Sequence, residues 1–145
     1  MQALLNNRIL IASLVAWLVA QVAKTLYEFV RHRKLLLNRL VSSGGMPSSH
    51  SALVTGLAAA TGRVMGISSA SFAITVVLAG VVMYDAAGVR RAVSIQARIL
   101  NQMIDEAHQG KPFAEKRLRE LIGHTPIQVL VGAVLGIVIA LLVIR

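Results

Sequence analysis

A short polar segment with one histidine and several serines lies at the start of an apolar stretch. It reads GGMPSSHSA over residues 44–52, with Ser48 and Ser49 directly before His50. A helix that begins there leaves its first N–H groups unpaired and carries a partial positive charge, so it suits an anion. Histidine can also move a proton near neutral pH. An anion site beside a proton donor indicates phosphate chemistry.

A second histidine, His124, stands just before another apolar stretch. Thr125 is a good N-cap and Pro126 suits the first helical position, so a helix should start there. Two histidines at such helix starts can divide phosphoryl transfer: one attacks phosphorus and the other protonates the leaving oxygen. Lys24 and nearby arginines would neutralise the charge on the equatorial oxygens.

The composition is that of an integral membrane protein. Of the 145 residues, 56% are hydrophobic and only 14% are charged. The chain has no cysteine, which excludes disulfides and thiolate metal sites. Its net charge is +9, but aromatics are only 4% and the charges fall between apolar runs. We therefore expect anionic lipid headgroups, not nucleic acid, as partners.

Four apolar stretches predict an all-α bundle of about four transmembrane helices, formed as a single domain over residues 1–145. The stretches are roughly Ile9–Ala23, Ser51–Gly66, Ile67–Tyr84 and Pro126–Ile144. The first two are shorter than the roughly 20 residues that a full crossing needs, so tilt or packing inside the bundle would have to compensate. The first stretch lacks the basic start and cleavage site of a signal peptide, and we expect it to be retained.

Most of the cations lie in two segments between these stretches. The segment after the first stretch holds Lys24, Arg31, Arg33, Lys34 and Arg39. The segment before the fourth stretch holds Arg90, Arg91, Arg98, Lys111, Lys116, Arg117 and Arg119. With four crossings both segments fall on one side of the membrane, and the positive-inside rule makes it the cytoplasm. Both histidines would then face the cytoplasmic side.

The second basic segment should itself be helical. Apolar residues recur at helical spacing over Val89–Glu106, which predicts an amphipathic cytoplasmic helix. A shorter helix over about Phe113–Ile122 should follow. Small residues form a G-x-x-x-G pair at Gly132 and Gly136 and a similar face around Gly56, which lets helices pack closely and leaves room for a homodimer.

The polar motifs resemble the three-part signature of the type-2 phosphatidic acid phosphatase superfamily. They are Lys24 with Arg31 after six residues, the segment PSSH at 47–50, and His124. The strings GGMPSSHSA (44–52), YDAAGVRR (84–91) and GHTPIQVLVGAVLG (123–136) are similar to its divergent bacterial and plastid branch. Members of that branch are often labelled acid phosphatase/vanadium-dependent haloperoxidase-related.

The resemblance implies a metal-independent membrane phosphatase without a cofactor. Lys24 and Arg31, together with Ser48 and Ser49, would bind phosphate. By the same resemblance, His50 would be the general acid, and His124 the nucleophile that becomes phosphorylated. The substrate would be a lipid phosphate monoester, such as phosphatidate, phosphatidylglycerophosphate or an isoprenyl phosphate. The membrane would be a bacterial inner membrane or a plastid-type membrane.

The sequence departs from the superfamily pattern at three places. His32 follows Arg31 where the usual motif has proline. No Ser-Arg pair precedes His124, so another arginine would have to bind phosphate, and we favour Arg90 or Arg91 over those at 117 and 119. Gln128 replaces the acid that orients the nucleophile.

A glutamine carbonyl can hold the imidazole N–H of the nucleophile, but it cannot stabilise an imidazolium as a carboxylate does. Activity would then be slow, or the orienting acid would be Asp85 or Glu120.

Most of these residues also have a structural interpretation. Ser48 and Ser49 could simply cap a helix, and Gln128 with Thr125 matches a capping box. Lys24 and Arg31 could be membrane anchors. Asp85 is best explained by a salt bridge to Arg90 or Arg91.

Three other function classes follow from the same sequence. A catalytically weak or inactive protein would bind anionic phospholipid or scaffold a partner. A small transporter or channel is less favoured, because the span interiors offer almost no polar path. Vanadate-dependent halide oxidation is implied only by kinship within the superfamily, and a lipid-embedded chain this small does not favour it.

Overall fold

The described part of the chain folds into helices, as the sequence predicts. The computed structural model describes residues 2, 6–32, 45–107 and 124–145. In these ranges the elements are α2 (Arg8–His32), α3 (Ser49–Met65), α4 (Ala70–Ala87), α5 (Val89–Ala107) and α6 (Pro126–Val143), and no strand occurs among them. The short helix expected over Phe113–Ile122 lies outside the described residues.

Three of these helices are long and apolar enough to cross a membrane. They are Arg8–Val30 within α2, with 23 residues, and α4 and α6, with 18 residues each. The protein is therefore an integral membrane protein. The fourth expected span corresponds to α3, which has 17 residues and ends with Arg63 in its last turn. At about 1.5 Å per residue α3 is about 25 Å long, slightly less than a bilayer core of about 30 Å.

The helix starts follow from capping side chains. Ser48 caps α3, since its side chain accepts from the Ser51 N–H, and Ser69 caps α4 by accepting from the Phe72 N–H. At α6, Thr125 and Gln128 form the complete capping box, with Pro126 as the first helical residue. Each cap satisfies N–H groups that a helix start leaves unpaired. The capping predictions for Ser48 and for Thr125 with Gln128 are thus confirmed.

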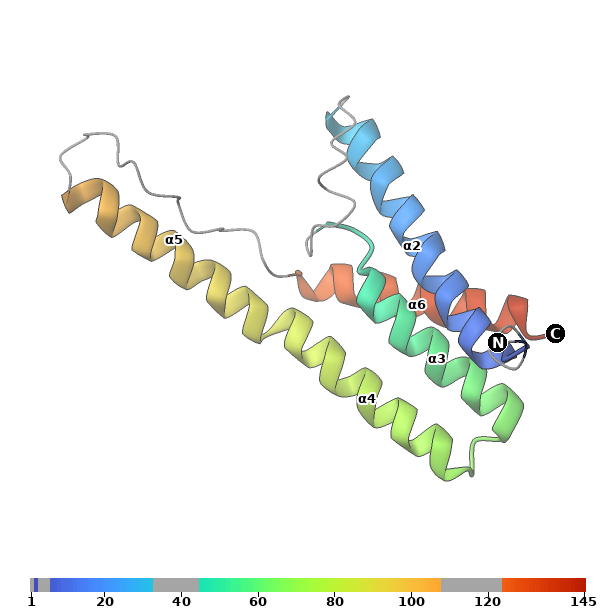
Figure 1. The fold of residues 1–145 in the computed structure, drawn as a ribbon. Coiled ribbons are helices and arrows are strands. Elements are labelled where there is room, and N and C mark those ends of the chain that lie inside the picture. Colours follow the sequence, from blue (N-terminus) through green and yellow to red (C-terminus); the bar gives the residue numbers. More distant parts are fainter. Residues whose placement is uncertain (1, 3–5, 33–44, 108–123) are drawn as a thin grey trace.

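Helix α3 is the centre of the bundle and packs against α2, α4 and α6 (Figure 1). Its contact with α6 depends on the two predicted glycines. A Cβ added at Gly132 would overlap the Ser48 carbonyl, and one at Gly136 would overlap the Ala52 carbonyl. Gly56 likewise lies against Ala16 of α2. The small-residue faces therefore serve packing within one chain, and a homodimer stays a prediction.

The helix directions bring two pairs of ends together. At one end of the bundle, the Arg8 guanidinium of α2 donates to the backbone carbonyl of Arg145 at 3.1 Å. At the other end, the Ser48 N–H before α3 donates to the Gln128 carbonyl of α6 at 3.1 Å. The C-terminal part of α2, the start of α3, the end of α4 and the start of α6 share this second end.

Helix α5 extends from the end of α4 and projects away from the other helices (Figure 1). Its bounds match the amphipathic helix expected over Val89–Glu106. Apolar side chains along it, among them Ile95, Ile99 and Met103, are exposed. This exposed apolar surface is suited to the membrane interface.

Candidate active site

His124 is held in place where α4 ends and α6 begins. Its backbone N–H donates to the carbonyl of Ala86 in the last turn of α4, at 3.2 Å. The residue is only 3% exposed, although it precedes the helix cap. A tight contact between two helix ends thus fixes the position of the imidazole.

Gln128 both caps α6 and orients the imidazole. Its Oε1 accepts a hydrogen bond from the Thr125 N–H at 3.0 Å and lies 3.3 Å from Nδ1 of His124. The backbone N–H can only donate, so the capping bond requires oxygen, not nitrogen, at this position. An oxygen facing Nδ1 requires Nδ1 to carry the hydrogen. In the neutral ring, Nε2 is then the basic nitrogen.

The charge environment keeps this imidazole neutral. Burial lowers the pKa of His124 below its usual value of 6.5, and the nearby Lys24 and His50 lower it further. Hydrogen bonds with Gln128 and with the backbone of Gly45 act in the opposite direction and are outweighed. The same interactions show that residues of α2, α3 and the turn before α3 surround the ring.

The turn before α3 lies directly on Lys24. Gly45 has a φ of 104°, and a Cβ there would be 2.8 Å from Cε of Lys24. Only glycine combines this backbone conformation with so close an approach. Lys24 itself is 3% exposed, so the lysine predicted to bind phosphate lies inside the bundle, next to the GGMPSSHSA segment.

The two serines are buried and His50 is exposed. Ser48 Oγ accepts hydrogen bonds from the Ser51 N–H at 3.4 Å and from the Ser51 hydroxyl at 3.0 Å, so it has a structural role. Ser49 is 5% exposed. His50, in the first turn of α3, can be reached from outside the bundle. The peptide bond between Met46 and Pro47 in this turn is cis.

Several predicted site residues have backbone positions only. The side chains of Arg31 on α2 and of Arg90 and Arg91 on α5 are outside what the structure describes. Arg117, Arg119 and Glu120 also lie outside the described residues. Asp85 is half-buried and directly precedes Ala86, whose carbonyl holds His124. Its salt bridge and its orienting role both stay predictions.

Two contributors to this site were not predicted from the sequence. One is the Ala86 carbonyl, a backbone group that no side-chain motif reports. The other is Glu28, whose Oε1 is 3.5 Å from the Cβ position of Gly45. Its place four residues after Lys24 on one helix was a signal that could have found it. Within the described ranges no three His, Asp or Glu side chains come together as metal ligands would.

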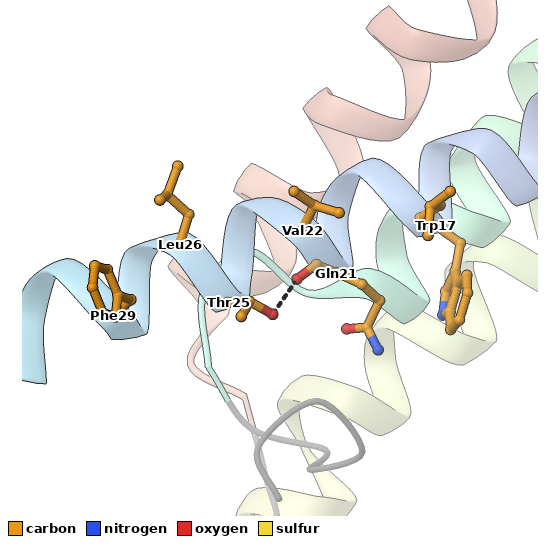
Figure 2. A pocket seen from close by; sticks show the side chains of 7 residues that line it. Trp17, Gln21, Val22, Thr25, Leu26 and Phe29 are labelled. Carbon is orange, nitrogen blue, oxygen red and sulfur yellow. Dashed lines mark hydrogen bonds between the residues drawn. The ribbon is translucent and has the colours of Figure 1, made fainter. Parts of the chain in front are cut away.

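An open cavity of about 550 Å³ runs along α2 (Figure 2). The described residues that line it are Trp17, Leu18, Gln21, Val22, Thr25, Leu26 and Phe29. The Thr25 hydroxyl donates to the Gln21 carbonyl of the same helix at 2.9 Å, so the wall is almost wholly apolar in character. Figure 2 shows these side chains projecting from α2 over three turns of the helix.

The described part of the chain is thus an all-helical membrane fold with two histidines and a lysine at one end of the bundle. The profile of the Divergent PAP2 family matches residues 5–139, so the chain belongs to that family. It is 39% identical over 149 residues to a Bacillus subtilis (strain 168) protein described as uncharacterized membrane protein YuiD, and the match covers 95% of this chain and 94% of the relative. A comparison with solved structures found no match.

Proposed function

We propose that the protein hydrolyses a lipid phosphate monoester through a phosphohistidine at His124. Nε2 of the neutral ring attacks phosphorus, and the bond to the leaving alkoxide oxygen breaks as His50 donates a proton to it. Water then attacks the phosphohistidine, His50 takes a proton from that water, and inorganic phosphate is released with Nε2 regenerated.

The observation that carries this proposal is the state of His124. The ring is buried, its Nδ1 lies beside Gln128, and its pKa is lowered, so Nε2 is the unprotonated nitrogen at neutral pH. Lys24 and His50 are near enough to influence its charge. A nucleophile, a cation and an exposed proton donor in one place are what phosphoryl transfer needs.

In this proposal the cations around the turn bind the phosphate group. Lys24 neutralises phosphate oxygens as they gain charge, and the start of α3 directs N–H groups toward the same region. In this proposal Arg31, Arg90 and Arg91 add further positive charge from α2 and α5. Ser49 contributes a second hydroxyl beside the capping Ser48.

The cavity on α2 suits the hydrocarbon tail of such a substrate. From Trp17 to Phe29 it follows twelve helical steps, or about 18 Å. Half of a bilayer core is about 15 Å, and the part of this interval from Trp17 to Lys24 is seven steps, or about 10 Å, so it would hold much of a tail in one leaflet. Lys24 lies on the same helix within this interval. A lipid of the cytoplasmic leaflet could therefore place its tail along α2 and its phosphate at the site.

The alternative is a protein that binds anionic phospholipid without hydrolysing it. One specific observation favours this alternative: the partner of Nδ1 is an amide, which cannot stabilise an imidazolium as a carboxylate would. Both functions predict phosphate binding, and only the first predicts turnover.

Phosphate release separates the two. The purified protein is incubated in detergent with EDTA and a panel of phosphatidate, phosphatidylglycerophosphate and isoprenyl phosphates, alongside His124→Ala and His50→Ala. We expect release by the wild type, none by His124→Ala and strongly reduced release by His50→Ala. Equal background release from all three proteins would leave only the binding function.

A further inference from the structure

An acidic side chain lies inside the cationic end of the bundle. Glu28 is on α2, one turn after Lys24. Glu28 Oε1 and Lys24 Cε are both within 3.5 Å of the same point, the Cβ position of Gly45. The second carboxylate oxygen, Oε2, is enclosed by protein. The turn that touches Lys24 therefore touches this carboxylate as well.

The burial of Lys24 makes such a neighbour necessary. The lysine is 3% exposed, and moving an ammonium group away from water is costly unless an opposite charge is close. Residues four apart on a helix face the same side, which places Glu28 correctly for this role. The other described ionisable groups at this end are His50 on α3, Asp85 on α4 and His124 before α6.

A carboxylate beside a phosphate site also affects the ligand. A phosphate group that reaches Lys24 comes close to Glu28, and like charges repel more strongly where protein replaces water. We propose that Glu28 is the counter-charge of Lys24 in the empty site, and that its repulsion weakens the hold on inorganic phosphate so that the product leaves. This rests on the proposed function, because it assumes that the site binds phosphate.

One effect of Glu28→Gln follows from this role. Inorganic phosphate should bind roughly fivefold to thirtyfold more tightly, as expected for removal of one nearby like charge in a partly buried site. Glu28→Asp keeps the charge, and its affinity for phosphate should stay close to that of the wild type.

Phosphate binding is measured by isothermal titration with inorganic phosphate in detergent, for wild type, Glu28→Gln and Glu28→Asp. Tighter phosphate binding in Glu28→Gln alone supports the proposal. Equal or weaker phosphate binding by Glu28→Gln overturns the proposal, since loss of a purely structural residue would not make the protein bind phosphate more tightly.

A double variant covers the case in which Glu28→Gln does not fold. If Glu28 balances Lys24, then Lys24→Met/Glu28→Gln folds where the single variant fails, because no uncompensated charge is left. Failure of both variants overturns the pairing. Neither measurement needs turnover. Absence of phosphate binding in the wild type contradicts the proposed function itself, whereas unchanged binding in Glu28→Gln contradicts only the role of Glu28.

Discussion

Replacing Gln128 with glutamate tests how the nucleophile is oriented. Its Oε1 already contacts both the Thr125 N–H and Nδ1 of His124, at 3.0 and 3.3 Å. Glutamate has nearly the same shape and is a common residue at this position of a capping box. Gln128→Glu therefore keeps both contacts and adds one negative charge beside the ring.

The size of the effect follows from the hydrogen bond to Nδ1. A bond to a charged group contributes about 1.5–3 kcal/mol, against about 1 kcal/mol for a neutral one. The bond at 3.3 Å is long and its acceptor is shared, so the lower part of that difference applies. A gain of about 1 kcal/mol in the transition state raises kcat about fivefold. The charge at the start of α6 adds about 0.3–1 kcal/mol of stability.

The assay compares kcat for phosphate release from phosphatidate at pH 8, where the ring is neutral in both proteins. The carboxylate should also raise the pKa of His124, so the acid limb of kcat/KM moves to higher pH. An unchanged kcat together with an unchanged acid limb would refute the contact between residue 128 and the nucleophile.

Two control variants separate capping from orientation. Thr125→Ala removes the hydroxyl that accepts from the Gln128 N–H at 3.4 Å, but leaves the amide oxygen beside the ring. It should cost about 1 kcal/mol of stability with little change in kcat. Gln128→Met should lower both the stability and kcat. A loss of kcat in Thr125→Ala as large as that in Gln128→Met would mean that only the helix start matters.

Three further predictions follow from the packing and the charges. Gly132→Ala should cost more than about 2 kcal/mol in thermal unfolding, because the new Cβ meets the backbone at the start of α3. The control Gly80→Ala has open space and should be neutral or stabilising, so equal effects of the two changes would contradict the close helix contact. Gly45→Ala should weaken phosphate binding, because its Cβ would displace the Lys24 side chain. The control Gly66 has a similar positive φ, of 87°, but no neighbour within 4 Å, so Gly66→Ala should only lower stability, and an equal loss of phosphate binding in both variants would contradict a specific contact at Lys24. Burial lowers the pKa of His124 in the folded state, so the contribution of His124 to stability is fully present above pH 6.5 and is lost as pH falls toward the folded pKa. Unfolding free energies measured at several pH values should show this loss for the wild type and less of it for His124→Gln, and parallel curves for the two proteins would refute the prediction.

The helices were predictable because their signals are local. Thr125, Gln128 and Pro126 mark the start of α6 by capping chemistry, and the glycines at 132 and 136 mark its packing face. The expected first span, Ile9–Ala23, was too short, since α2 continues to His32. The basic residues suggested a boundary at Lys24, although a helix can keep a buried lysine where an acid one turn later balances it.

The sequence predicts which candidate residues lie near one another, but it does not predict the contacts between them. Motif spacing identified His124, His50 and Lys24, and the structure brings them together at one end of the bundle. Motif spacing did not reveal the contacts of the Ala86 carbonyl and of the turn at Gly45, because close approach of the backbone depends on how the helices pack. Gln128 was expected either to cap or to orient, and one oxygen makes both contacts because the cap and the ring share one helix start.

Direct detection of a covalent intermediate tests the central claim most closely. Protein mixed with a lipid phosphate labelled with ³²P is quenched in alkali within the first turnover, and the labelled peptide is identified by mass spectrometry. We predict acid-labile, alkali-stable label on His124 that is absent from His124→Ala. Hydrolysis without label on His124, or label on another residue, would contradict the account.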